Sequence, residues 1–236
     1  MQAVLDEVEQ LVATFRQRPE CELEVRVGLY QPETQTFQVG ESADFFRRQV
    51  QKWHGADPKA NGEVWSSFTN ATRALTLYFE NGVRGRYLPE QPAIFERIQR
   101  IRTVECRSPT RPYHLRFSLK QEAKCEFTDK NPPITPATFA RSILFWNFVD
   151  KEKRYRCDFR KVQSGKGNKE EALKHPPHYE AEIELQREYF TLLHPKLKRP
   201  FTNREIALHF VNLGIDLLGR CNKGVREPVT LQLIQT

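Results

Sequence analysis

The chain has 236 residues, of which 39% are hydrophobic and 28% charged, so it is long enough and apolar enough to bury a core. No apolar run approaches the roughly 20 residues that span a bilayer. The first residues also lack a basic segment followed by an apolar one, so we expect neither a membrane helix nor a secretory signal. Lys and Arg number 37 against 30 Asp and Glu, and this excess of +7 favours a polyanionic partner.

Three segments have the periodicity of amphipathic helices. The first spans 4–15 and carries its apolar residues on one face. The second spans 42–53 and begins on a serine N-cap. The third spans 202–219, begins with a Thr-x-x-Glu capping box and ends at a glycine.

Most of the remaining chain alternates apolar and polar residues between turn-rich pieces, as strands do. The expected strands are 20–30, 63–70, 73–80, 82–88, 98–106, 113–122, 138–149, 153–162 and 179–190. The last residues, 228–236, have the pattern of a further strand, whereas 131–136 and 164–178 read as long connections. We therefore expect a single domain over residues 1–236, of α+β class but mainly β.

Four of these strands carry their charge on one face and apolar side chains on the other. The acidic faces are Glu20, Glu22 and Glu24 in the first strand and Glu180, Glu182 and Glu184 in the last. The basic faces are Arg116 and Lys120 in 113–122 and Arg154, Arg156 and Arg160 in 153–162. One interpretation is an ordinary half-buried sheet with its charges toward water.

The segregation of acids and bases by strand favours a second interpretation, a cavity that binds a metal and a polyanion together. Neighbouring carboxylates on one face repel unless a cation lies between them. Mg²⁺ and Mn²⁺ prefer carboxylate oxygens, and arginine binds phosphate in bidentate fashion. A closed antiparallel β-barrel with a polar lumen would meet these needs, with the amphipathic helices covering its apolar outer face.

The charged motifs also resemble a known family. They are Glu22-x-Glu24 in CELEVRVG, Arg116 followed six positions later by Glu122, Arg156-x-Asp158, and the triplet Glu180-x-Glu182-x-Glu184. In order and spacing, from about residue 20 to 190, they resemble the metal-dependent RNA 5′-triphosphatases of fungal and large-DNA-virus mRNA capping systems. These enzymes belong to the triphosphate tunnel metalloenzyme superfamily.

The chain departs from the family pattern in one strand and leaves the orientation of another undecided. The family strand before Arg-x-Asp alternates three basic residues, and here only Arg141 is carried over. Lys120, or Arg154 and Arg160, would then replace the missing lysine. An earlier basic strand contains both Arg84 and Arg86, and the sequence does not decide which of them faces inward, or whether both do.

The resemblance implies a closed eight-stranded tunnel, dependence on Mg²⁺ or Mn²⁺, removal of the γ-phosphate from triphosphate-ended RNA, and NTPase activity. It implies that Glu22, Glu24 and Glu184 hold the metal and that Glu182 or Glu180 orients or deprotonates the attacking water. The implied phosphate ligands are Arg84, Arg86, Arg116, Lys120, Arg141 and Arg156. Asp158 and Glu122 would hold these basic side chains in place.

The expected partners are 5′-triphosphate RNA, NTPs and, in further domains or subunits, the guanylyltransferase and methyltransferase of capping. Five widely spaced cysteines without a CxxC pair favour a reducing intracellular compartment, either the cytoplasm, including a viral factory or virion, or the nucleus. Two alternatives stay open. One is a tunnel enzyme that acts on inorganic tripolyphosphate or polyphosphate, and the other is a nonenzymatic β-barrel that binds RNA.

Overall fold

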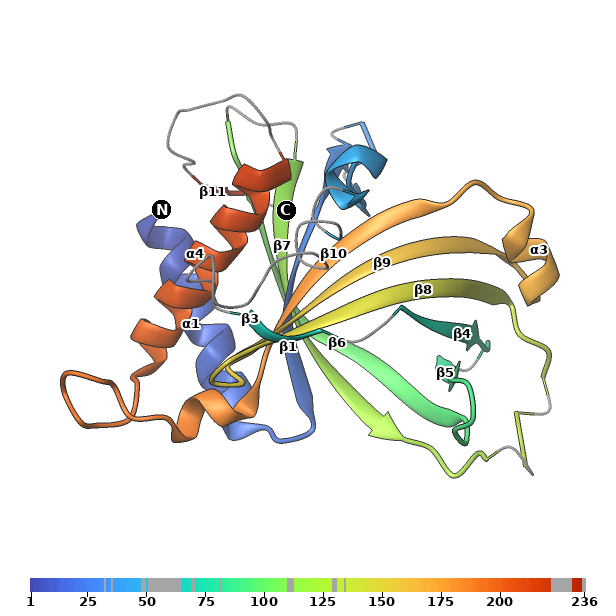
Figure 1. Cartoon of the computed structure of the whole chain (residues 1–236), viewed down its shortest axis with the longest axis horizontal. Helices are drawn as coiled ribbons and strands as arrows, with labels where there is room; N and C mark the ends of the chain where they lie inside the picture. Colours follow the sequence, from blue (N-terminus) through green and yellow to red (C-terminus); the bar gives the residue numbers. More distant parts are fainter. Residues whose placement is uncertain are drawn as a thin grey trace.

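The core of the structure is an antiparallel β-barrel (Figure 1). The computed structural model describes residues 1–31, 33–34, 36–47, 50, 65–68, 71–80, 82–109, 113–128, 131–133, 135–221 and 231–234. Its barrel strands are β1 (Cys21–Gln31), β4 (Thr72–Tyr78), β5 (Val83–Tyr87), β6 (Ile94–Arg107), β7 (Tyr113–Lys124), β8 (Phe139–Asp150), β9 (Tyr155–Lys166) and β10 (His178–Leu185). The order is β10-β9-β8-β4-β5-β6-β7-β1, and pairing of β1 with β10 closes the barrel.

Three shorter strands extend the sheet within the described residues. They are β2 (Thr36–Val39) on β1, β3 (Trp65–Phe68) on β8 and β11 (Gln232–Leu233) on β6. The sequence predicts β3 and the terminal β11 but not β2. The closed eight-stranded antiparallel barrel expected from the sequence is confirmed.

Two long helices cover the apolar outer face of the barrel on the side of β1, β6 and β7 (Figure 1). These are α1 (Gln2–Gln17) and α4 (Asn203–Cys221). The α4 residue Phe210 is fully buried and packs against Phe117 of β7, with ring centroids 5.6 Å apart. Burial of such side chains between helix and sheet supplies most of the free energy that holds the helices on the barrel.

The expected helix caps are present. Thr202 Oγ1 accepts a hydrogen bond from the backbone N–H of Glu205, whose carboxylate accepts one from the N–H of Thr202. The helix continues to Cys221, two residues past the expected glycine end. In the second expected helix, residues 43–47 are helical and Ser42 Oγ accepts from the N–H of Phe45. Its later part, residues 51–53, lies outside the described residues.

Two segments differ from the sequence expectation. The last barrel strand ends at Leu185, and a 3₁₀ helix, η1 (Arg187–Thr191), replaces the expected extension to residue 190. The Arg187 side chain donates to three backbone carbonyls around the start of β1, which the sequence pattern does not report. A short helix, α3 (Lys169–Leu173), capped by the Asn168 side chain, lies inside the expected connection 164–178.

None of the described helices is long and apolar enough to cross a membrane.

Candidate active site

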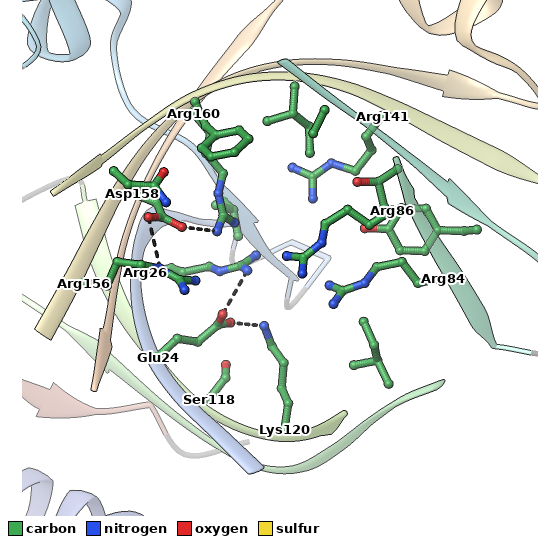
Figure 2. Close-up of a pocket in the computed structure, with 18 of the residues that line it drawn as sticks. Glu24, Arg26, Arg84, Arg86, Ser118, Lys120, Arg141, Arg156, Asp158 and Arg160 are labelled. Atoms are coloured by element: carbon green, nitrogen blue, oxygen red, sulfur yellow. Dashed lines mark hydrogen bonds and ion pairs between the residues drawn. The ribbon is translucent and has the colours of Figure 1, made fainter. Parts of the chain in front are cut away.

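The barrel encloses a cavity of about 360 Å³ whose lining is rich in cations (Figure 2). The lining includes nine basic residues and two acids. The basic residues are Arg26, Arg84, Arg86, Arg100, Arg116, Lys120, Arg141, Arg156 and Arg160, and the acids are Glu24 and Asp158. Such an excess of positive charge in a confined space with low-dielectric walls attracts a small polyanion.

Buried glutamates from β1 and β10 lie beside these cations. Glu24 faces Glu184 across the β1–β10 pair, and Arg26 faces Glu182 in the same register. Arg26 forms ion pairs with both Glu24 and Glu182, whose side chains are only 3% and 5% exposed. Lys120 also pairs with Glu24. The two acidic strands predicted from the sequence therefore do meet, with an arginine between them.

Each remaining β10 glutamate also has an arginine partner. Arg156 NH2 lies 2.5 Å from Glu184 Oε2, and Arg141 NH2 lies 2.5 Å from Glu180 Oε1. His178, which the sequence places in a loop, is instead the first residue of β10, and its Nε2 is 2.9 Å from Glu180 Oε1. These arginines give buried carboxylates the counter-charge that burial requires.

The pKa values of the buried glutamates follow from these partners. Burial acts to raise the pKa of Glu182, but Arg160 and Arg26 outweigh it and hold that pKa well below its ordinary value. Burial also acts to raise the pKa of Glu180, but the hydrogen bond with His178 and the charge of Arg141 outweigh it and bring that pKa below its ordinary value. Both side chains are therefore ionised at neutral pH.

Glu22 has the opposite environment. Burial and the charges of Glu184, Glu122 and Glu182 raise its pKa to about 8. Its side chain forms no hydrogen bond or ion pair among the described residues, although its backbone pairs with Lys120 of β7. A cation placed among several carboxylates reduces their mutual repulsion and favours their ionised forms. The donor chemistry around Glu22, Glu24 and Glu184 therefore fits a hard divalent metal. In the described part of the chain, no three His, Cys, Asp or Glu side chains already converge in a ready-made metal site.

Both arginines of β5 line the cavity, which answers the question that the sequence leaves open. Arg84 is held by two acids, with its NH2 2.7 Å from Glu96 Oε2 and 2.9 Å from Glu122 Oε1. Arg86 has no acidic partner among the described residues, and Figure 2 shows its guanidinium pointing into the cavity. Arg86 is therefore a free cation in the lumen, whereas Arg84 is a neutralised one.

Arg116 is held in place by β2, the strand that the sequence does not reveal. The Arg116 guanidinium lies 4.2 Å from the centroid of the Phe37 ring and pairs with Glu105 at 2.5 Å. The Phe37 ring in turn lies against Gly28, where an added Cβ would be 2.6 Å from the ring. Only glycine permits this close approach, so Gly28 and Phe37 together set the position of Arg116.

The structure brings together all six predicted phosphate ligands and Asp158 in one cavity lining, but of the five predicted metal and catalytic glutamates only Glu24 reaches that lining. Glu180, Glu182 and Glu184 each pair with an arginine of the lining, whereas the Glu22 side chain has no such partner among the described residues. Three further cations line the cavity: Arg26, Arg100 and Arg160. The sequence could have identified Arg26 as a lumen residue, because it lies two positions after Glu24 and so on the same face of the strand. Arg154, which we considered as a replacement for the missing family lysine, instead pairs with Asp150 and is not part of the lining.

Solved structures share this architecture. The S. pombe Pct1 RNA triphosphatase matches with a TM-score of 0.67 and 15% identity over 94% of this chain and 93% of its own. The Mimivirus capping enzyme triphosphatase matches with a TM-score of 0.55 and 12% identity over 90% of this chain and 96% of its own. The chain has the fold of the capping RNA triphosphatases. No protein-family model and no curated protein sequence matches the chain.

This fold places the cavity and its nine cations inside a tunnel formed by the eight barrel strands. Because the identities are between 11% and 15%, the shared property is the fold, and the chemistry has to be argued from the residues of this chain.

Proposed function

We propose that this chain is a metal-dependent polynucleotide 5′-triphosphatase that removes the γ-phosphate from triphosphate-ended RNA, the first step of mRNA capping, and that it also hydrolyses NTPs. The observation that carries the proposal is the tunnel itself, where nine basic residues face a cavity beside buried glutamates from two strands. A polyanion with several adjacent phosphates matches this arrangement better than a single phosphate does. The fold shared with RNA triphosphatases from S. pombe and Mimivirus supports the same assignment.

Glu22, Glu24 and Glu184 would hold Mg²⁺ or Mn²⁺ in this proposal. The support for these ligands is that burial and the neighbouring carboxylates together raise the pKa of Glu22 to about 8. A bound ion would neutralise charge on the γ-phosphate and on the carboxylates together.

The basic residues would hold the phosphates. Arg86 and Arg100, which have no acidic partner among the described residues, offer their charge to the substrate without breaking an existing ion pair. The other basic residues would exchange part of their contacts with carboxylates for contacts with phosphate oxygens. These are Arg84, Arg116, Lys120, Arg141 and Arg156. Asp158, which pairs with Arg160, and Glu122, which pairs with Arg84, would hold basic side chains in orientation.

Glu182 or Glu180 would orient the attacking water and accept its proton. Their lowered pKa values keep both carboxylates ionised and so able to accept a hydrogen bond from water. The water oxygen bonds to the γ-phosphorus as the bond to the bridging oxygen of the β-phosphate breaks, which releases inorganic phosphate and leaves diphosphate-ended RNA.

The wider setting is also a proposal. Residues 1–236 would form one triphosphatase domain that works with guanylyltransferase and methyltransferase domains or subunits. The S. pombe enzyme is also known in complex with the Spt5 CTD, which supports a role that involves protein partners. Cys21, Cys106, Cys125 and Cys157 form no disulfide, which supports a reducing compartment, the cytoplasm or the nucleus.

The test is release of the γ-phosphate from labelled triphosphate-ended RNA, measured with Mg²⁺ and with Mn²⁺. We expect the Glu24→Ala and Glu182→Ala variants to lose about 100-fold or more in rate. Glu126→Ala, a change at an exposed glutamate outside the tunnel lining, is the matched control and keeps full activity. If the wild type releases no phosphate with either metal, or if both tunnel variants stay fully active, the proposal is wrong. Comparing RNA, ATP and tripolyphosphate as substrates separates an RNA triphosphatase from a tripolyphosphatase.

A further inference from the structure

A second cavity, of about 560 Å³, forms a groove on the outer face of β4, β8 and β9 beside α3. The strand register places Arg73 opposite Leu144, and Leu144 opposite Lys161. These side chains point away from the tunnel, because the residues that alternate with them, such as Ala74 and Ile143, lie on the tunnel side. Two cations on the outer face therefore flank a leucine, about 10 Å apart by the spacing of strands in a sheet.

The charge of this groove is not neutralised. Arg73, Lys161 and, from α3, Lys169 line it, and no Asp or Glu belongs to its lining as described. None of the three forms an ion pair within the described part of the chain. The lining also includes Tyr87, whose ring packs edge to face against Phe95 with centroids 5.9 Å apart, and Leu173, which is 46% exposed. Unpaired cations beside an aromatic ring are the features of a groove that binds single-stranded nucleic acid.

The groove lies next to the tunnel. Strand β5 ends at Tyr87, which pairs with Leu75 of β4. The β4–β5 register does not continue beyond that pair to Arg73 and Ala74. Ala74 and Leu88 line both the tunnel cavity and the groove. The tunnel cavity and the groove therefore adjoin each other at Ala74 and Leu88.

An RNA whose triphosphate is held inside the tunnel has to leave it with its first nucleotides. We propose that the RNA strand leaves past Leu88 and lies in the groove, with backbone phosphates on Arg73, Lys161 and Lys169. This inference rests on the proposed function and names how the substrate is distinguished from a free nucleotide. Phosphate contacts of this kind position a strand without reading its sequence, so the groove selects for RNA length rather than for a base.

The test compares a long with a short substrate in the double variant Arg73→Glu/Lys161→Glu. Both side chains lie on the surface of the sheet and outside the tunnel, so ATP hydrolysis should stay at the wild-type rate. For a 5′-triphosphate 12-mer RNA, we expect KM to rise by about 10-fold or more. The slope of log binding constant against log salt should fall by about 1.4, which is about 0.7 for each of two phosphate contacts on a single strand.

The matched control is Lys151→Glu/Lys196→Glu, which makes the same change in net charge at exposed lysines outside the groove. It should leave the KM of the 12-mer within about 2-fold and the salt slope unchanged. Binding of a 5′-hydroxyl 12-mer, followed by fluorescence anisotropy, tests the groove even if no substrate is hydrolysed, so failure of the proposed function and failure of this inference are distinguishable. Unchanged RNA affinity in the groove variant would overturn the inference, as would an equal loss on ATP and on RNA. If RNA affinity is unchanged while an acidic leucine-containing peptide binds the wild type and not the variant, the groove belongs to a protein partner and the inference is wrong.

Discussion

Replacing Arg26 by methionine removes the side chain that joins the two acidic strands. Arg26 pairs with Glu24 and Glu182, two carboxylates that are almost fully buried. Removal of one partner of a buried ion pair costs about 3–5 kcal/mol, because the other charge is left without compensation. Lys120 still pairs with Glu24 and Arg160 with Glu182, so we place Arg26→Met at the lower end, about 3 kcal/mol. In a chain of this length that lowers Tm by about 6–12 °C.

The assay is thermal unfolding by circular dichroism, first with a chelator and then with Mn²⁺. The ion should restore part of the lost stability, since it replaces the missing positive charge beside the glutamates. Arg100→Met is the matched control, because Arg100 also lines the cavity but is exposed and has no acidic partner among the described residues. It should change the free energy of unfolding by less than about 0.5 kcal/mol. An Arg26→Met protein as stable as the wild type without metal would refute the reasoning about the buried ion pairs.

Three other changes test separate parts of the account. Arg86→Ala should raise the KM for ATP by about 10- to 100-fold through loss of a charged hydrogen bond, with little change in Tm. Arg84→Ala should raise this KM and also lower Tm, because Glu96 and Glu122 lose their partner. Equal Tm values for the two variants would contradict this distinction. The pKa of Glu22, raised from 4.5 to about 8, means that between these pH values the folded chain keeps a proton that the unfolded chain has released, so this group lowers stability as pH rises. Glu22→Gln should therefore have a higher Tm than the wild type at pH 8 without metal and an equal Tm at pH 4, and a lower Tm at pH 8 would show that the sign is wrong. Phe210→Ala should lower the free energy of unfolding by about 3–5 kcal/mol in chemical denaturation and Phe210→Leu by much less, whereas a loss below about 1 kcal/mol would mean that α4 contributes little to holding the barrel.

The sequence predicts the barrel well because its strands alternate apolar side chains on the outer face with charged side chains on the lumen face. The strict alternation in β1 and β10 reports both the strand and the side that faces the lumen. The capping box at Thr202 is equally local, and it is present as expected. These features depend on residues that are close in the chain, which is why a single sequence reveals them.

Features that depend on pairing between distant strands are not visible in the same way. The position of Arg26 between Glu24 and Glu182 follows from the β1–β10 register, which no local pattern specifies. The contact of Phe37 with Arg116 depends on β2, a four-residue strand that is too short to give a periodic signal. The sequence could therefore identify the charged residues of the tunnel but not the ion pairs that hold them.

The most direct test of the central claim is a crystal structure of the protein with Mn²⁺ and tripolyphosphate, with the ion located by its anomalous scattering. We predict one manganese peak inside the tunnel on the carboxylates of Glu22, Glu24 and Glu184, with the tripolyphosphate in contact with Arg86. Manganese found only outside the barrel, or a tripolyphosphate bound only on its outer surface, would contradict the account.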